Sequence, residues 1–402
     1  MKKNLGILYL TVTIDFLGVG LVIPIFAPLF LSQNSNLFAS QIDFSVRSFL
    51  LGITLALFPF FQFFGAPILG ALSDKFGRKN ILFLSVFGTF IGYILMVFGI
   101  ALQNLYLIVL SRAIDGFTGG NISVANSAIS DISKPEDKVK NFGMLGAIFG
   151  ICFILGPFLG GKLSDPNVAS FFNFQTPFIV AAFLSFINLG LIALFFKDTL
   201  AQRIERTVSL KTGIINLKKA FTEEKFSTIF TTLFLISLGF SFFTQFFQAY
   251  LVSKFNFTQA EIGELFAYIG IWIALTQGLF VRWIPKSIKP ATMVFFGTLF
   301  LGLALITLII PNQASQIYFI LPFVALSNGL LAPNSQALVS NLASENAQGE
   351  IFGINQSVSS LGIALAPVIS GIIYNFDIRL PILMAGSLIL LGSLIFKKNF
   401  KI

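Results

Sequence analysis

Apolar stretches of about twenty residues recur from one end of this 402-residue chain to the other. An α-helix needs about 20 such residues to cross the hydrocarbon core of a bilayer. Hydrophobic residues make up 55% of the chain and charged residues only 11%, whereas about 25% charged residues is usual in a soluble domain. The sequence therefore predicts an all-α fold, that of a polytopic membrane protein.

Twelve stretches fit a membrane span. They cover residues 6–31, 46–72, 80–101, 105–130, 140–163, 177–197, 226–252, 260–283, 290–311, 316–340, 350–375 and 380–396. Basic residues gather in the loops on one side of these spans, which the positive-inside rule places in the cytoplasm together with both termini. The opposite loops hold only Arg47, Lys162, Lys254 and Arg379. The first stretch is too long for a signal peptide and contains Asp15, so we expect it to remain as the first span.

The composition also excludes several classes of protein. The net charge of +9 lies in short loops between spans, so membrane orientation explains it and nucleic acid is not an expected partner. The sequence has no His, and its one cysteine, Cys152, lies in an apolar span, which excludes disulfides. It contains no metal-spaced cluster, catalytic constellation or phosphate-binding loop. We therefore expect no enzyme, no metal and no other cofactor.

A polar stretch at residues 198–225 divides the chain into an N-terminal half, 1–197, and a C-terminal half, 226–402. This stretch is either a plain cytoplasmic linker or a linker that contains a short amphipathic helix on the inner leaflet. Three dipeptide pairs repeat with an offset of about 210 residues: Asn126-Ser127 and Asn334-Ser335, Phe142-Gly143 and Phe352-Gly353, Gly156-Pro157 and Ala366-Pro367. The offset indicates two six-helix bundles of the same orientation, with a substrate site between them near the midplane.

Polar side chains concentrate in the first, fourth, seventh and tenth spans. A polar side chain that faces lipid costs free energy, so these spans should line a wet cavity. The candidate substrate-binding residues are the amides of the last three of these spans. They are Asn121, Gln245, Gln248, Asn328, Asn334 and Gln336. Phenylalanines around the two glutamines suggest that the surface is partly aromatic, although most of the 51 Phe residues must face lipid or pack.

Arg112 lies halfway along the fourth span, where an isolated guanidinium is costly and needs a partner. Asp115 lies one turn along the same helix, and Asp15 lies in the first span. A carboxylate that separates from an arginine can take up a proton, which is the minimum that proton-coupled transport requires. The same residues could instead form a permanent structural salt bridge. We take Asp15, Arg112 and Asp115 as the candidate proton-coupling residues.

Four sequence motifs narrow the class further. They are Asp15–Pro24 in the first span, Gly70–Lys79 in the loop after the second, Arg112–Gly116 with Gly119-Gly120 and Ile129–Ile132 in the fourth, and Gly156–Gly161 in the fifth. In this order and on these spans, the motifs resemble the major facilitator superfamily and, within it, the twelve-span drug:proton antiporters of the tetracycline-exporter type. The resemblance implies a monomer in the bacterial inner (plasma) membrane, surrounded by lipid, that exchanges a small-molecule substrate for protons.

The resemblance also implies roles for particular residues. Asp74, Arg78 and Asp131 would form a charge network that locks the cytoplasmic side, with a turn at Gly77. Gly156 and Pro157 would belong to a stripe of small residues that packs across the interface between the halves and pivots during exchange. Pro157 should bend its helix.

The sequence departs from tetracycline exporters in two spans. Those proteins carry an acid in the third span, where this chain has Gly92, and another in the ninth, where residues 291–310 contain none. Asp115, in contrast, occupies a position that is apolar in those relatives. The differences argue against export of tetracycline–metal complexes and suggest that the titratable group has moved.

Three functions remain open. The first is proton-coupled efflux of small lipophilic compounds, neutral or cationic. The second is transport of a particular metabolite, such as an amino acid, nucleoside, sugar or siderophore. The third is a membrane sensor or scaffold that does not transport.

Overall fold

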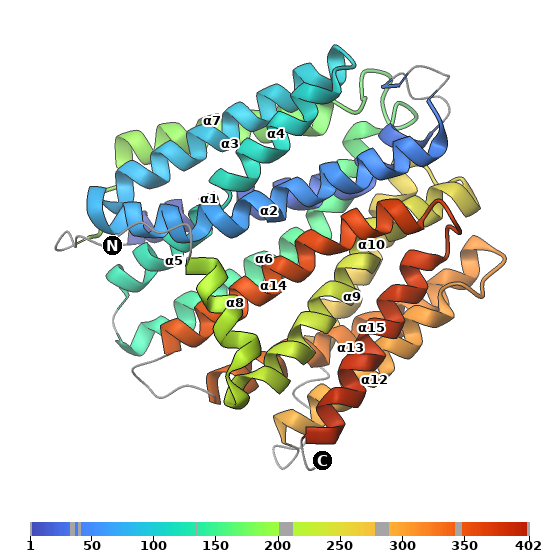
Figure 1. The fold of residues 1–402 in the computed structure, drawn as a ribbon. Helices are drawn as coiled ribbons and strands as arrows, with labels where there is room; N and C mark the ends of the chain where they lie inside the picture. Colours follow the sequence, from blue (N-terminus) through green and yellow to red (C-terminus); the bar gives the residue numbers. More distant parts are fainter. Residues whose placement is uncertain are drawn as a thin grey trace. The chain divides into compact units, whose positions relative to one another are not determined.

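The computed structural model describes residues 2–32, 37–38, 42–133, 135–200, 212–277, 289–341 and 348–399, and these residues form helices and connecting turns with no strand among them. Figure 1 shows the helices coloured along the chain. Their bounds are α1 (Lys2–Leu31), α2 (Phe44–Phe76), α3 (Arg78–Ala101), α4 (Leu105–Thr118), α5 (Asn121–Ile132), α6 (Pro135–Ser164), α7 (Thr176–Phe195), α8 (Thr212–Thr222), α9 (Glu224–Phe255), α10 (Gln259–Leu275), α12 (Pro290–Thr307), α13 (Ala314–Asn341), α14 (Gln348–Ile373) and α15 (Leu380–Asn399).

Ten helices in the described part of the chain are long and apolar enough to cross a membrane. They correspond to ten of the twelve predicted spans. A spanning segment is expected to be helical, because a helix satisfies its backbone hydrogen bonds internally and lipid offers none. The predicted fourth span is present as α4 and α5, which meet at Gly119 and Gly120. The predicted eighth span begins as α10, and its last residues, 278–283, lie outside the described residues.

The contacts divide the chain into two compact units. The first consists of Met1–Ile42, Leu57–Thr212 and Thr258–Glu264, and the second of Asp43–Ala56, Gly213–Phe257 and Leu265–Ile402.

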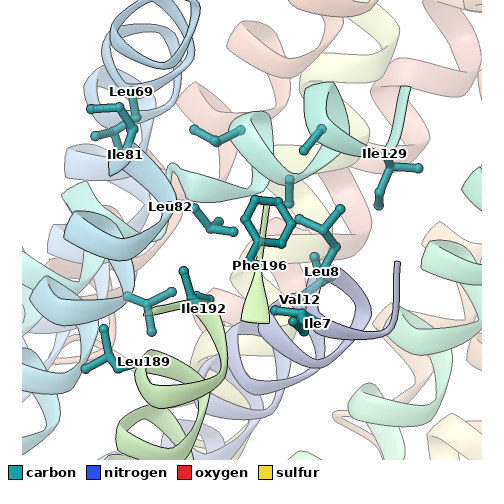
Figure 2. Packing of buried hydrophobic residues seen from close by; sticks show 14 residues of the cluster. Ile7, Leu8, Val12, Leu69, Ile81, Leu82, Ile129, Leu189, Ile192 and Phe196 are labelled. Carbon is teal, nitrogen blue, oxygen red and sulfur yellow. The ribbon is translucent and has the colours of Figure 1, made fainter. Parts of the chain in front are cut away.

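In the first unit, α1 packs on α6 and α7, and α3 packs on α4 and α7. One hydrophobic core joins α1, α3, α5 and the end of α7, and Figure 2 shows the ring of Phe196 between Leu82 and Leu8 of this core. Phe196 is 1% exposed although it is the first residue after α7. The chain after α7 is thereby held against the bundle, which brings Asp198, the start of the polar stretch 198–225, to the start of α3.

In the second unit, α9 packs on α14 and α15, and α12 packs on α13 and α15. A hydrophobic core around Phe230, Ile354 and Val358 also takes up Ala220 of α8. Helix α8 lies within the predicted linker, so of the two alternatives for that stretch the structure contains the short amphipathic helix. Ile214 and Ile215 of α8 are 57% and 51% exposed.

Close contact between α2 and the α4–α5 junction explains the glycines of the fourth-span motif. A Cβ on Gly120 would overlap the backbone nitrogen of Ala66, and a Cβ on Gly65 would overlap the carbonyl oxygen of Phe117. Two helix backbones approach this closely only where side chains are absent. This contact holds α4, which carries Arg112 and Asp115, against α2.

Candidate functional site

Arg112 and Asp115 form a buried ion pair in the first unit. The two residues are 5% and 6% exposed, and Arg112 Nη1 lies 3.6 Å from Asp115 Oδ2. The spacing of three residues on α4 brings them to one face of the helix, as the sequence predicts. Because an isolated charge within a membrane is costly, each residue supplies the partner that the other needs.

Two phenylalanines complete the surroundings of the guanidinium. The Arg112 guanidinium carbon lies 5.6 Å from the ring centre of Phe26 on α1 and 4.7 Å from that of Phe58 on α2. Both distances are within the range of a cation–π interaction. Sequence reasoning missed these contacts, because nothing marks these two rings among the 51 phenylalanines of the chain.

Asp15 of α1 lies close enough to Asp115 for the two acids to interact electrostatically, and it lies near the amide of Asn121. Tyr93 of α3 interacts electrostatically with both acids and with Arg112. The structure therefore brings the three candidate proton-coupling residues together and adds Tyr93, which is 3% exposed. We call Asp15, Tyr93, Arg112, Asp115 and Asn121 the membrane polar cluster.

Several atoms of the membrane polar cluster are buried without a hydrogen-bond partner among the described residues. They are Asp15 Oδ2, Arg112 Nε, and Oδ1 and Nδ2 of Asn121. Most buried polar atoms in proteins do have a partner, and those that lack one are often functional. The cluster can thus offer both acceptors and donors to a proton, a water molecule or a polar group of a substrate.

The candidate amides of the second unit lie on α9 and α13. Gln248 is fully buried, and its Nε2 donates to the backbone oxygen of Gln245 at 3.1 Å. Asn334 Nδ2 donates to the backbone oxygen of Leu330 at 2.7 Å. Asn328 and Asn334 are half-buried, and Gln336 is exposed.

The predicted aromatic surface on α9 is wrong for most of its rings. Four of them are at most 1% exposed: Phe242, Phe243, Phe246 and Phe247. Three of them pack within the second unit against other rings: Phe243 against Phe266, Phe246 against Tyr374, and Phe247 against Tyr250. These four rings therefore pack inside the protein, one of the two roles that the sequence predicts for most of its phenylalanines.

A second charge cluster lies where α2 ends and α3 begins. Arg78 Nη1 lies 2.7 Å from Asp74 Oδ1, and Arg78 Nε donates to Asp131 Oδ2 at 3.0 Å. Arg78 is 5% exposed, which is unusual for an arginine at a helix end. The three residues are joined as the resemblance implies, and we call them the cytoplasmic cluster.

Asp198 and Thr199, the first residues after the sixth predicted span, extend the cytoplasmic cluster. The backbone N–H of Arg78 donates to Asp198 Oδ1 at 3.1 Å, and Thr199 Oγ1 donates to Asp131 Oδ2 at 3.2 Å. An acid at the start of α3 also interacts favourably with the helix dipole. Sequence reasoning placed Asp198 in the linker, and its position directly after a span was the one available signal.

Gly77 is the turn that makes this arrangement possible. Its φ of 95° and ψ of 148° lie in a region that residues with a side chain rarely adopt. A Cβ at this position would also overlap Asp198 Oδ2. The second-half copy of this loop, residues 281–286, lies outside the described residues.

The small-residue stripe on α6 has more than one neighbour. A Cβ on Gly156 would lie 2.8 Å from the Cα of Gly20 on α1, and Gly160 also packs against α1. Gly161 and Pro157 instead contact the start of α10 at Gly263. Gly146 and Gly150, earlier on the same helix, have no described neighbour within 4 Å of such a Cβ.

Helices of membrane-spanning length around a buried ion pair are the features expected of a polytopic membrane protein with a functional site in its interior. The sequence profile of the Major Facilitator Superfamily matches residues 8–330 and 229–400. The chain belongs to this superfamily, which confirms the family that its motifs resemble.

Similar proteins agree with this assignment along nearly the whole chain. The tetracycline resistance protein, class H, of Pasteurella multocida is 29% identical over 402 residues, which are 98% of this chain and 94% of that protein. The quinolone resistance protein NorA of Staphylococcus aureus is 30% identical over 398 residues, which are 98% of this chain and 96% of NorA.

Two solved structures share the fold. The human organic anion transporter MFSD10 (TETRAN) matches with a TM-score of 0.72 and 19% identity over 98% of this chain and 99% of that one. A D-xylose-proton symporter matches with a TM-score of 0.77 and 13% identity over 98% of both chains.

Proposed function

We propose that this protein is a secondary active transporter that exports small lipophilic compounds in exchange for protons. The observation that carries the proposal is the membrane polar cluster, which unites an arginine and two acids from two helices in one unit. Relatives that align along the whole chain are named for tetracycline and quinolone resistance, which supports efflux as the direction of transport.

The cluster can couple protons to transport in a simple way. With Asp115 ionised, its pair with Arg112 is complete; when Asp115 takes up a proton, the pair loses its negative partner. The guanidinium is then held by the rings of Phe26 and Phe58, and it is free to interact with Asp15 or with substrate. Proton binding thereby changes the electrostatics of α4 relative to α1, and an ionised Asp15 would then be the acid that keeps Arg112 from becoming an isolated buried charge.

The cytoplasmic cluster would act as the lock of alternating access. It joins the end of α2, the start of α3, the end of α5 and the first residues after α7 by charge-assisted hydrogen bonds, which are stronger than neutral ones. A network of this kind can open and close as a two-state element. In this proposal it forms in one access state and breaks in the other.

The proposal includes several further features of the protein. Substrate would bind near Asn121 in the first unit and near Gln245, Gln248, Asn328, Asn334 and Gln336 in the second. The protein would work as a monomer in the plasma membrane with both termini in the cytoplasm. It would require no cofactor and would catalyse no reaction.

Transport into vesicles tests the proposal. Purified protein in liposomes, with an imposed pH gradient, should accumulate a fluorescent lipophilic cation, and a protonophore should abolish the accumulation. Asp115→Asn and Asp15→Asn should each lose gradient-driven transport. The control is Asp377→Asn, which removes an acid of an exposed ion pair with Arg379 outside the predicted spans.

Two outcomes would contradict the proposal. Gradient-driven uptake of one metabolite with no response to any lipophilic compound would make this chain a metabolite transporter. If no compound in a mixed drug and metabolite panel raised the melting temperature or was transported, the sensor or scaffold function would replace it, because a bound ligand must stabilise the folded protein.

A further inference from the structure

Gly92 of α3 lies directly against Asp115 of α4. A Cβ built on Gly92 would be 3.0 Å from the Cβ of Asp115 and 3.5 Å from its Cα and backbone nitrogen. A separation of 3.0 Å between two such carbons is shorter than ordinary van der Waals contact, which is about 3.5–4.0 Å. A side chain at position 92 would therefore fit only if Asp115 moved by a few tenths of an ångström, and in this chain α4 supplies the one carboxylate of this pair of positions.

Neighbouring groups leave Asp115 little freedom to move. Arg112 lies on its own helix, Thr89 and Tyr93 approach from α3, and Asp15 approaches from α1. Asp115 is 6% exposed, and its Oδ2 is already 3.6 Å from Arg112 Nη1. A shift of a few tenths of an ångström away from α3 would bring this pair to the limit of a salt bridge.

We propose that Gly92 is the positioning residue for the Asp115 carboxylate, and that positions 92 and 115 together form one site for a single carboxylate that either helix can supply. The inference rests on the proposed function, because the value of this carboxylate is its part in proton coupling. The site requires one acid at the α3–α4 contact, within reach of Arg112, and either helix can carry it.

A merely structural role for Gly92 gives a different expectation. If α3 and α4 only need a small residue for close packing, then an alanine and an aspartate at position 92 should behave alike once Asp115 is removed. If the contact is a carboxylate site, only the aspartate should restore transport. The carboxylate at position 92 therefore separates the two possibilities, because only the carboxylate-site role requires it for transport.

The test is a reciprocal exchange measured in the liposome assay with the fluorescent lipophilic cation. Asp115→Gly removes the acid and the Cβ, and Gly92→Asp places two acids at one contact. Each should lower gradient-driven transport by at least about tenfold, since a positioned proton-transferring group contributes about 10²–10⁴ in rate. The double variant Gly92→Asp/Asp115→Gly should recover to within about threefold of the native rate, because a single acid again lies at the contact. Gly92→Ala/Asp115→Gly, the matched control, should not recover.

Melting temperatures test the shared contact without any transport. Gly92→Ala should lower the melting temperature of the native chain, because its Cβ meets that of Asp115. The same change should cause no loss in the Asp115→Gly background, where the opposing Cβ is gone. This measurement does not depend on whether the reciprocal double variant folds.

Several results would overturn the inference. They are full transport by Asp115→Gly, equal transport by the two double variants, and an equal loss of melting temperature from Gly92→Ala in both backgrounds. Failure of the native protein to use a pH gradient would refute the proposed function instead. If the native protein transports and Asp115→Gly does not, absence of rescue by Gly92→Asp refutes the shared carboxylate site alone.

Discussion

Replacing Gly77 by alanine should destabilise the turn between α2 and α3 by about 2–4 kcal/mol. The backbone of Gly77, with φ 95° and ψ 148°, lies in a region reserved for glycine, and holding another residue there costs about 1–3 kcal/mol. The added Cβ would overlap Asp198 Oδ2, so the carboxylate must leave the Arg78 N–H to which it is bonded at 3.1 Å. Asp198 is exposed, so this second loss is about 1 kcal/mol, less than the roughly 1.5–3 kcal/mol of a buried bond to a charged group.

A pair of substitutions separates the two contributions. Asp198→Ala should cost about 1 kcal/mol in the native chain and less in the Gly77→Ala background, where the bond from Arg78 is already broken and only that from the Leu200 N–H remains to be lost. The assay is the melting temperature of the purified protein in detergent, followed by intrinsic fluorescence, together with transport in liposomes. Gly77→Ala should also reduce transport, because the N-terminus of α3 carries Arg78 into the cytoplasmic cluster.

Two results would refute this reasoning. An unchanged melting temperature for Gly77→Ala would mean that the backbone relaxes to an ordinary conformation without loss. Losses from Gly77→Ala and Asp198→Ala that simply add would mean that the carboxylate and the Cβ do not compete for the same space.

Four further changes have outcomes that the structure predicts. Arg78→Lys should lower the free energy of unfolding by about 2 kcal/mol and reduce transport, because one ammonium group cannot replace the two guanidinium contacts to Asp74 and Asp131. The melting temperature and the rate of transport in liposomes measure the two effects, and an unchanged transport rate would contradict the role of the cytoplasmic cluster as a lock. Phe58→Leu should cost about 1–2 kcal/mol, because it removes the ring 4.7 Å from Arg112; a melting temperature equal to the native value would show that the ring does not hold the guanidinium. Gly120→Val should lower expression and melting temperature through overlap with the α2 backbone, with a cost of about 1–3 kcal/mol or more, and normal stability would mean that α2 can move away. Asp377→Asn should lower the melting temperature only slightly, because an exposed ion pair contributes little, and the difference from the native protein should be the same throughout pH 5 to 8. Hydrogen bonds from Arg379 lower the pKa of Asp377 to about 2, so its contribution is complete above the unfolded pKa of about 4 and is lost as the pH falls through about 2; a difference that varies between pH 5 and 8 would contradict this.

Much of the fold could be predicted because each span carries its own signal. Apolar length alone places α1, α2, α3, α6 and α7 close to their observed bounds, since a helix in lipid satisfies its own backbone. The predictions are least detailed where local signals are weak. The fourth span is two helices rather than one, and its junction depends on α2 lying against Gly119 and Gly120.

The candidate site was predicted in part, and the division has a physical reason. Charged residues within spans are rare, so Asp15, Arg112 and Asp115 stand out in the sequence. Their pairing follows from the helical repeat for Arg112 and Asp115, whereas the approach of Asp15 requires the packing of α1. Phe26 and Phe58 could not be selected, because an aromatic ring on one helix gives no local sign that it faces a cation on another.

The sequence by itself determined the class of this protein, its spans, and the residues that must find partners within the membrane. It did so because the hydrophobic effect and the cost of buried charge act on each helix separately. Only the tertiary structure decided which side chains meet. It placed Asp198 against the start of α3, four phenylalanines of α9 in the core of the second unit, and Gly92 against Asp115. These contacts join residues far apart in the chain, and their geometry depends on how whole helices pack.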